Sequence, residues 1–156
     1  MRVWLILACL AAAQSTAPRP APPIETKHLT LSLSSGAVTA GKVPLYVDVT
    51  PQEKMHVYAP GQKGYIAIEL TLDADAPVKA AGKTKYPPAK KLLMPALNET
   101  QLVYSTPFRI TQDVVLRPGT PAGPIAITGT LRYQACDDNI CYKPTTLALR
   151  WAFSNP

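Results

Sequence analysis

Residues 125–153, IAITGTLRYQACDDNICYKPTTLALRWAF, contain two strongly patterned segments joined by a polar loop. Apolar residues recur at every second position in 125–133 and again in 145–153, which is typical of β-strands with one buried face. The loop between these segments contains Cys136 and Cys141, with four residues between them. The pattern predicts a β-hairpin whose tip presents two cysteine side chains.

The preceding part of the chain shows the same alternation in short segments that end at Gly and Pro residues. The other expected strands are residues 29–34, 43–50, 55–58, 65–72, 102–104 and 107–116. Residues 77–91 are expected to form a long loop, and so are residues 92–98, because Pro95 interrupts them. No segment has a sustained helical period. We therefore predict an all-β fold, an antiparallel β-sandwich of about eight strands, with Trp151 in its core.

The N-terminus has the pattern of an export signal. Arg2 precedes an apolar run at residues 3–13, which is too short to span a bilayer and ends in small residues that a signal peptidase accepts. A lipoprotein attached through Cys9 is the less favoured alternative, since its apolar segment would be shorter still. No later apolar run is long enough to cross a membrane. The predicted organisation is a signal peptide at 1–13, a Pro-rich tether at 14–27 and one β-domain at 28–156.

The charge of the chain does not indicate a particular class of binding partner. The formal net charge is +6, and part of it comes from a lysine cluster. The cluster comprises Lys79, Lys83, Lys85, Lys90 and Lys91. Such clusters can attract acidic partners or membrane surfaces, but we favour a solvated loop face. We expect no binding to nucleic acid, because the chain is predicted to be exported and lacks interleaved Arg and aromatic residues.

Two cysteines in an oxidising compartment can form a disulfide, and three interpretations of the pair are open. A structural cross-link between residues so close in sequence would stabilise the fold by only roughly 2 kcal/mol. A metal site is weakly supported, because a closed zinc site needs about four ligands and the histidines, His28 and His56, are distant in sequence. We therefore predict neither a metal nor a cofactor. Thiol–disulfide exchange fits better, since it needs an accessible sulfur and a resolving partner nearby.

The residues around the cysteines indicate how the thiols should behave. Asp137 and Asp138 lie between them and should disfavour a thiolate, and no Lys, Arg or His lies there to offset this effect. Tyr133 and Tyr142 flank the pair. We therefore predict poorly reactive thiols that become active only when a partner protein docks.

The stretches YQAC (133–136) and CYKP (141–144) resemble the active-site loop of the N-terminal periplasmic domain of the thiol:disulfide interchange protein DsbD. HVY (56–58) and LVY (102–104) are also similar to that family, and the likeness extends over residues 28–153. The family spaces its two cysteines one residue further apart than this chain does.

The resemblance implies an immunoglobulin-like sandwich in the periplasm that relays electrons by thiol–disulfide exchange. Its partners would be a thioredoxin-like or DsbD-type membrane reductant and oxidised periplasmic client proteins. In the family the second cysteine attacks the client disulfide and the first resolves the mixed disulfide, so these roles fall on Cys141 and Cys136. Tyr58 would support the pair from a neighbouring strand, whereas we expect His56 to be solvated.

The family also has a cap loop with an aromatic residue that covers the sulfurs until a partner docks. Its counterpart lies in residues 93–99, which contain no aromatic residue. The candidate cap residues are Met94, Leu97 and Asn98. Two other functions remain open at this stage: a non-catalytic immunoglobulin-like binding domain with a structural disulfide, and a periplasmic metal carrier.

Overall fold

The computed structural model describes residues 21–95 and 98–156. The predicted signal peptide with Cys9, the first part of the predicted tether and the candidate cap residue Leu97 lie outside the described residues. The described part contains no helix with the length and apolar character that crossing a bilayer requires.

The described residues form twelve β-strands, and the pairings between them are antiparallel. The strands are β1 (Ile24–Glu25), β2 (Leu29–Ser35), β3 (Lys42–Pro51), β4 (His56–Tyr58), β5 (Glu69–Leu72), β6 (Val78–Ala81), β7 (Lys90–Met94), β8 (Glu99–Tyr104), β9 (Phe108–Leu116), β10 (Gly123–Tyr133), β11 (Ala135–Cys136) and β12 (Thr145–Asn155).

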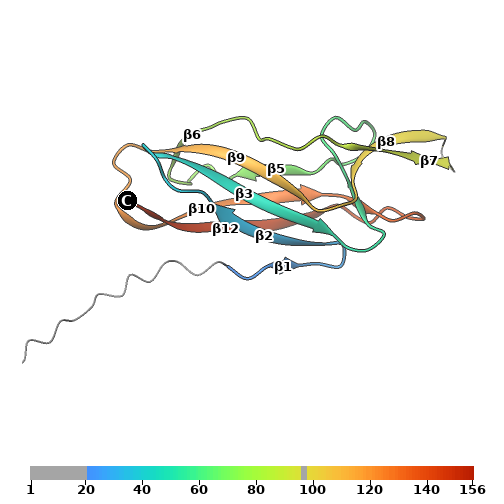
Figure 1. Ribbon diagram of the computed structural model, residues 1–156, viewed down its shortest axis with the longest axis horizontal. Helices are drawn as coiled ribbons and strands as arrows, with labels where there is room; N and C mark the ends of the chain where they lie inside the picture. The colour runs from blue at the N-terminus through green and yellow to red at the C-terminus, as the bar shows by residue number, and fades with distance from the viewer. Residues whose placement is uncertain (1–20, 96–97) are drawn as a thin grey trace, which may run out of the picture.

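Three sheets are built from these strands. A five-stranded sheet has the order β1-β2-β3-β9-β6, a three-stranded sheet the order β12-β10-β5, and a four-stranded sheet the order β11-β4-β8-β7. The β7–β8 hairpin and the loop between β10 and β12 extend to the same end of the elongated molecule (Figure 1). The all-β prediction is confirmed, and the four-stranded sheet carries the cysteines at this end.

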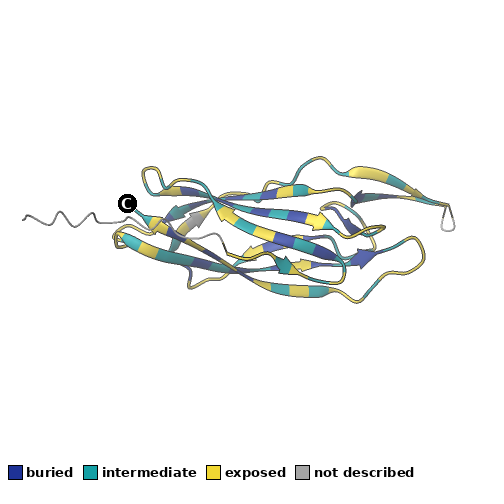
Figure 2. Cartoon of the chain, turned by 60° about the horizontal axis from the view of Figure 1, so that its bottom comes forward, coloured by how far each residue is buried: buried dark blue, intermediate teal, exposed yellow. Residues whose placement is uncertain are grey.

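The core forms because the long strands alternate buried and exposed residues, as the period-two pattern requires. Figure 2 shows this alternation as dark and light bands along each strand. Leu29, Leu45, Ile110 and Leu131 are fully buried in the resulting cluster. Trp151 lies in this core as predicted, and its indole N–H donates a hydrogen bond to the backbone carbonyl of Tyr46 at 3.0 Å.

Four of the twelve strands were not predicted: β1, β6, β7 and β11. The expected loop at 92–98 was wrong in its first part, because β7 pairs with β8 and Pro95 ends the strand after Met94 instead of preventing it. β6 likewise lies inside the expected loop at 77–91, where it pairs with β9. The sheet also begins earlier than the expected domain boundary at 28, since Ile24 pairs with Leu31 and packs against the core.

The expected strand at 65–72 is shorter in the structure. Only Glu69–Leu72 pair with β10. The backbone N–H of Ile68 donates to the carbonyl of Tyr58, and the N–H of Ile66 donates to the side-chain oxygen of Gln134. Residues 65–68 therefore leave the three-stranded sheet and run along the four-stranded one, next to the cysteines.

Candidate functional site

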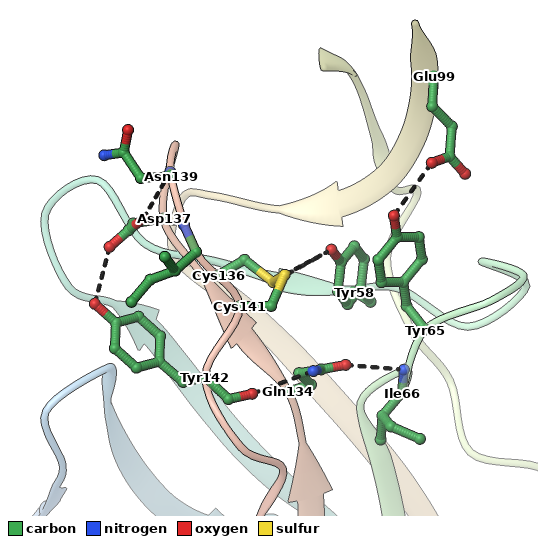
Figure 3. Close-up of a disulfide and its surroundings, with 11 residues drawn as sticks. Tyr58, Tyr65, Ile66, Glu99, Gln134, Cys136, Asp137, Asn139, Cys141 and Tyr142 are labelled. Carbon is green, nitrogen blue, oxygen red and sulfur yellow. Dashed lines mark hydrogen bonds between the residues drawn. A yellow bond between two sulfur atoms is a disulfide. The ribbon is translucent and has the colours of Figure 1, made fainter. Parts of the chain in front are cut away.

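The β10–β12 hairpin places the cysteines, as predicted. Its paired region ends at Tyr133 and Thr145, and the intervening loop crosses to the four-stranded sheet, where β11 pairs with β4. Cys136 lies directly opposite His56 in that pairing. Cys136 and Cys141 form a disulfide with a Cα–Cα distance of 4.0 Å (Figure 3). Cys136 therefore belongs to a strand of the four-stranded sheet, whereas Cys141 lies in the segment that leads to β12.

The two cysteines differ sharply in exposure. Cys136 is 1% exposed and packs in a small cluster with Tyr58 and Val103. Cys141 is exposed. Thiol–disulfide exchange proceeds by attack of a thiolate along the S–S bond, so access decides which sulfur an external thiolate reaches. In this geometry that sulfur belongs to Cys141.

The hydroxyl of Tyr58 contacts both sulfurs of the disulfide. Its oxygen is 3.2 Å from Sγ of Cys136 and 3.3 Å from Sγ of Cys141. The sulfurs of a disulfide carry no proton, so the Tyr58 O–H is the donor in both contacts. Burial, with smaller contributions from Tyr65 and Glu99, raises the pKa of Tyr58 to about 12. Tyr58 therefore keeps its proton at neutral pH and acts as a hydrogen-bond donor to the disulfide.

Tyr65 connects Tyr58 to the β7–β8 hairpin. The two tyrosine rings stack with centroids 4.3 Å apart, and the Tyr65 hydroxyl donates to Oε2 of Glu99 at 3.2 Å (Figure 3). Leu92 of β7 packs against the cluster that contains Cys136. Tyr65 was not predicted as a site residue, because its proximity to the cysteines depends on the path of residues 65–68 and has no local sequence signal.

Gln101 is a buried polar residue of β8, two positions before Val103, which pairs with Tyr58. It is 1% exposed, and its side-chain amide acts against the rise in the pKa of both Tyr58 and Tyr65. Its Oε1 atom has no hydrogen-bond partner among the described residues. The sheet face that carries the disulfide therefore also buries an amide with unused hydrogen-bonding capacity.

The Asp137 carboxylate stabilises the conformation of the cysteine loop through hydrogen bonds. Its Oδ1 accepts hydrogen bonds from the backbone N–H groups of Asn139 at 2.7 Å and Ile140 at 2.8 Å, and its Oδ2 accepts one from the Tyr142 hydroxyl at 2.8 Å. These bonds lower the pKa of Asp137, the backbone N–H groups contributing most. Asp138 is exposed and makes no comparable set of bonds among the described residues.

Tyr142 and Gln134 fasten the two ends of the loop. The Tyr142 ring lies 4.4 Å from the His28 ring, measured between centroids. The Gln134 side chain donates to the carbonyl of Tyr142 at 3.1 Å and accepts from the N–H of Ile66 at 3.3 Å. Gln134 was also missed in the sequence, because both of its partners are set by tertiary packing.

The remaining predicted site residues lie further from the sulfurs. Tyr133 is buried in the main core, and its hydroxyl is 3.3 Å from Oγ1 of Thr26. Met94 is half-buried on β7 opposite Glu99, and Asn98 is exposed with a φ of 50°. The aromatic ring that stacks on Tyr58 belongs to Tyr65, which lies outside the predicted cap segment.

His56 is buried, which corrects the expectation that it is solvated. It is 2% exposed, and its ring meets the Tyr58 ring edge-on with centroids 5.9 Å apart. Its Nε2 atom has no hydrogen-bond partner in the described part of the chain. Burial lowers the pKa of His56, while Asp138 and Asp137 act in the opposite direction. From the sequence, β4 looks like a short, exposed strand. In the structure it pairs with β11 on one side and β8 on the other, and this pairing buries His56.

The described residues contain no group of three or more His, Cys, Asp or Glu side chains that could hold a metal ion. The groups gathered at the site are the two sulfurs, the Tyr58 hydroxyl and the imidazole of His56.

Two solved structures are similar to this chain, and the first of them supports the fold. The N-terminal periplasmic domain of ScsB from Proteus mirabilis superposes with a TM-score of 0.60 at 14% identity, covering 80% of this chain and 46% of that one. The reduced N-terminal domain of DsbD from Neisseria meningitidis gives a TM-score of 0.49 at 16% identity, covering 83% of this chain and 86% of that one. This chain thus spans about half the length of the ScsB chain that it matches.

No curated protein sequence matches this chain significantly. A family profile described as "Thiol:disulfide interchange protein DsbD, N-terminal" matches residues 27–150. That range includes the disulfide, Tyr58, Tyr65 and both strands of the cysteine hairpin up to Arg150. With most of the sequence matched and the fold in agreement, the chain belongs to the family of DsbD N-terminal domains.

Proposed function

We propose that this protein is an exported thiol–disulfide exchange module that works through Cys136 and Cys141. It relays electrons from a thioredoxin-like or DsbD-type membrane reductant to oxidised client proteins in the periplasm. The observation that carries this proposal is the disulfide itself, with Cys136 buried, Cys141 exposed and the Tyr58 hydroxyl donating to both sulfurs. Membership of the DsbD family supports it.

Loading with electrons begins at the exposed sulfur. A thiolate of the reductant attacks Sγ of Cys141, the Cys136–Cys141 bond breaks, and Cys136 leaves with the electron pair as a thiolate. The Tyr58 O–H donates to that sulfur and stabilises the developing charge, since hydrogen bonds to charged groups are stronger than neutral ones. A second thiol of the reductant then attacks the mixed disulfide and releases Cys141.

Delivery to a client runs the same steps in reverse. The Cys141 thiolate attacks a client disulfide and forms a mixed disulfide, and one client sulfur leaves as a thiolate. Cys136 then attacks Sγ of Cys141, which re-forms the internal disulfide and expels the second client sulfur. Two electrons and two protons pass to the client, and the domain returns to the oxidised form seen here.

The proposed location follows from the organisation predicted above. Residues 1–13 would direct export and be removed, residues 14–27 would form the N-terminal Pro-rich segment whose last part, β1, joins the sheet, and the β-domain would function in the periplasm. The ScsB domain of similar fold is described as periplasmic.

Trapping of a mixed disulfide tests the proposal. In a Cys9→Ser background, the Cys136→Ala variant keeps Cys141 as its sole cysteine. It should accumulate disulfide-linked partners in the periplasm because nothing resolves them, and mass spectrometry would identify thioredoxin-fold proteins or proteins with cysteine pairs. The matched Cys141→Ala variant should trap far less, since Cys136 is buried. Equal absence of adducts from both variants would contradict the proposed function.

A further inference from the structure

We propose that His56 is the proton acceptor for Cys136, taking the thiol proton when Cys136 attacks the mixed disulfide. This inference deepens the proposed function, on which its catalytic meaning rests. It assigns a role in the resolving step to a buried histidine that the sequence analysis expected to be solvated.

The first observation is register. His56 and Cys136 are directly opposite each other in the antiparallel pair of β4 and β11. Side chains at opposite positions project from the same face of a sheet, with Cβ atoms about 4.5–5.5 Å apart. The two side chains therefore leave neighbouring positions on one face of the strand pair, in a site that excludes solvent, because His56 is 2% and Cys136 1% exposed.

The second observation is an unused nitrogen. Nε2 of His56 is buried and has no hydrogen-bond partner among the described residues. Buried polar atoms are nearly always paired, so an unpaired one calls for an explanation. In the disulfide form Cys136 has no proton to share. Once the bond opens, Cys136 becomes a thiol, and the free imidazole nitrogen can accept its proton.

The charges around His56 favour this transfer. The titratable groups around the ring are Tyr58 on its own strand, Cys136 on the paired strand, and Asp137 and Asp138 on the following loop. Burial lowers the pKa of His56, so the ring is neutral and can accept a proton at neutral pH. The carboxylates of Asp138 and Asp137 act oppositely and stabilise the imidazolium once it forms.

The proton and electron balance of the step is complete without another reagent. The Cys136 thiol gives its proton to His56, and the resulting thiolate attacks Sγ of Cys141. The Cys136–Cys141 bond forms, the bond from Cys141 to the client sulfur breaks, and the client sulfur leaves with the electron pair. The client thiolate takes a proton from solvent, and the imidazolium returns its proton to solvent.

The direct test is the pKa of Cys136 in a protein that cannot form the disulfide. A Cys9→Ser/Cys141→Ser variant keeps Cys136 as its sole thiol, whose thiolate is followed by ultraviolet absorbance as the pH is raised. Adding His56→Phe, which keeps an aromatic ring but cannot bind a proton, should raise the Cys136 pKa by about one unit, or about tenfold in thiolate at neutral pH. His56→Gln should act in the same direction.

His28→Phe is the matched control. His28 also lies at the cysteine loop, against Tyr142, and also has an unpaired Nε2 atom, but it is not opposite Cys136. This change should leave the Cys136 pKa within about 0.3 of a unit, well inside the one-unit effect expected at His56. A Cys136 pKa that is unchanged by both His56 substitutions, or raised equally by His28→Phe, would overturn the proposal.

A second measurement leaves His56 in place, so its result does not depend on whether the His56 variants fold. In the Cys9→Ser/Cys141→Ser protein, the ring NMR signals of His56 should shift with the same midpoint as the Cys136 absorbance, because the two sites share a proton. Unrelated midpoints would also overturn the proposal. Neither readout requires a client, so a coupled pair found alongside failed trapping would refute the proposed function and leave the His56–Cys136 assignment standing.

Discussion

Gln112 and Gln101, the two glutamines that are buried among the described residues, differ in how completely their side chains are hydrogen-bonded. Gln112, on β9 of the five-stranded sheet, accepts a hydrogen bond from the Thr84 hydroxyl and donates to the carbonyl of Gly82. Gln101, on β8 of the four-stranded sheet, leaves its Oε1 unpaired. The other buried, unpaired side-chain atoms among the described residues are Nε2 of His28 and Nε2 of His56, and both histidines also flank the cysteine loop.

This difference separates a region built for stability from a region built for chemistry. The main core is apolar, and its buried polar groups have partners. The cysteine end buries an imidazole, an amide, a hydroxyl and a sulfur together. Unpaired buried polar atoms cost stability, so they persist where another role needs them. The sandwich supplies the free energy that allows this end to remain incompletely bonded.

The largest expected effect is in the main core. Leu131→Ala removes a fully buried side chain of β10 and should lower the free energy of unfolding by about 3 kcal/mol, from lost burial and the cavity that remains. Urea unfolding of the oxidised protein measures this loss. A change below about 1 kcal/mol would mean that the core is not the main source of stability.

Opening the disulfide should cost less than that core substitution. The Cys136→Ser/Cys141→Ser variant removes a bridge between residues five apart, for which the chain-entropy estimate is roughly 2 kcal/mol. The same urea experiment, with dithiothreitol-reduced wild type as a second comparison, checks it. A loss exceeding that of Leu131→Ala would make the disulfide a structural staple and reverse the comparison.

The sequence predicted the sandwich well because its strands are defined locally. Period-two alternation located β2, β3, β9, β10 and β12, and with the last two it located the cysteine loop between them. Short strands were missed, since β1, β6, β7 and β11 are stabilised by neighbours and not by their own pattern. The candidate site depends on such pairings: the register of β4 with β11 buries His56, and the path of residues 65–68 delivers Tyr65.

Tyr58→Phe should slow thiol–disulfide exchange while it leaves the packing of the ring unchanged. Loss of the hydroxyl removes the donor to both sulfurs while the ring keeps its stack on Tyr65, so the rate of reduction by a small dithiol should fall about tenfold. Stopped-flow kinetics of dithiothreitol reduction provide the measurement. Tyr65→Phe is the control, because it loses only the bond to Glu99 and should retain most of the wild-type rate.

The smallest effect concerns pH and the fold of the loop. The pKa of Asp137 is lower in the folded protein than its ordinary value of 3.8, so its contribution to stability is present above that value and is lost as the pH falls through the folded pKa. Asp137→Asn should therefore lower the melting temperature slightly at neutral pH and leave it nearly unchanged in strong acid. A larger loss in acid than at neutral pH would contradict the assigned loop bonds.

The reduction potential of the Cys136–Cys141 pair tests the central claim, that this disulfide exists to be opened. Equilibration of the protein with buffers of defined thiol–disulfide potential, followed by quantification of alkylated cysteines, gives the value. We predict a single two-electron transition between about −300 and −120 mV, the range of proteins that exchange disulfides. A potential well below about −300 mV, typical of structural disulfides, would contradict the account.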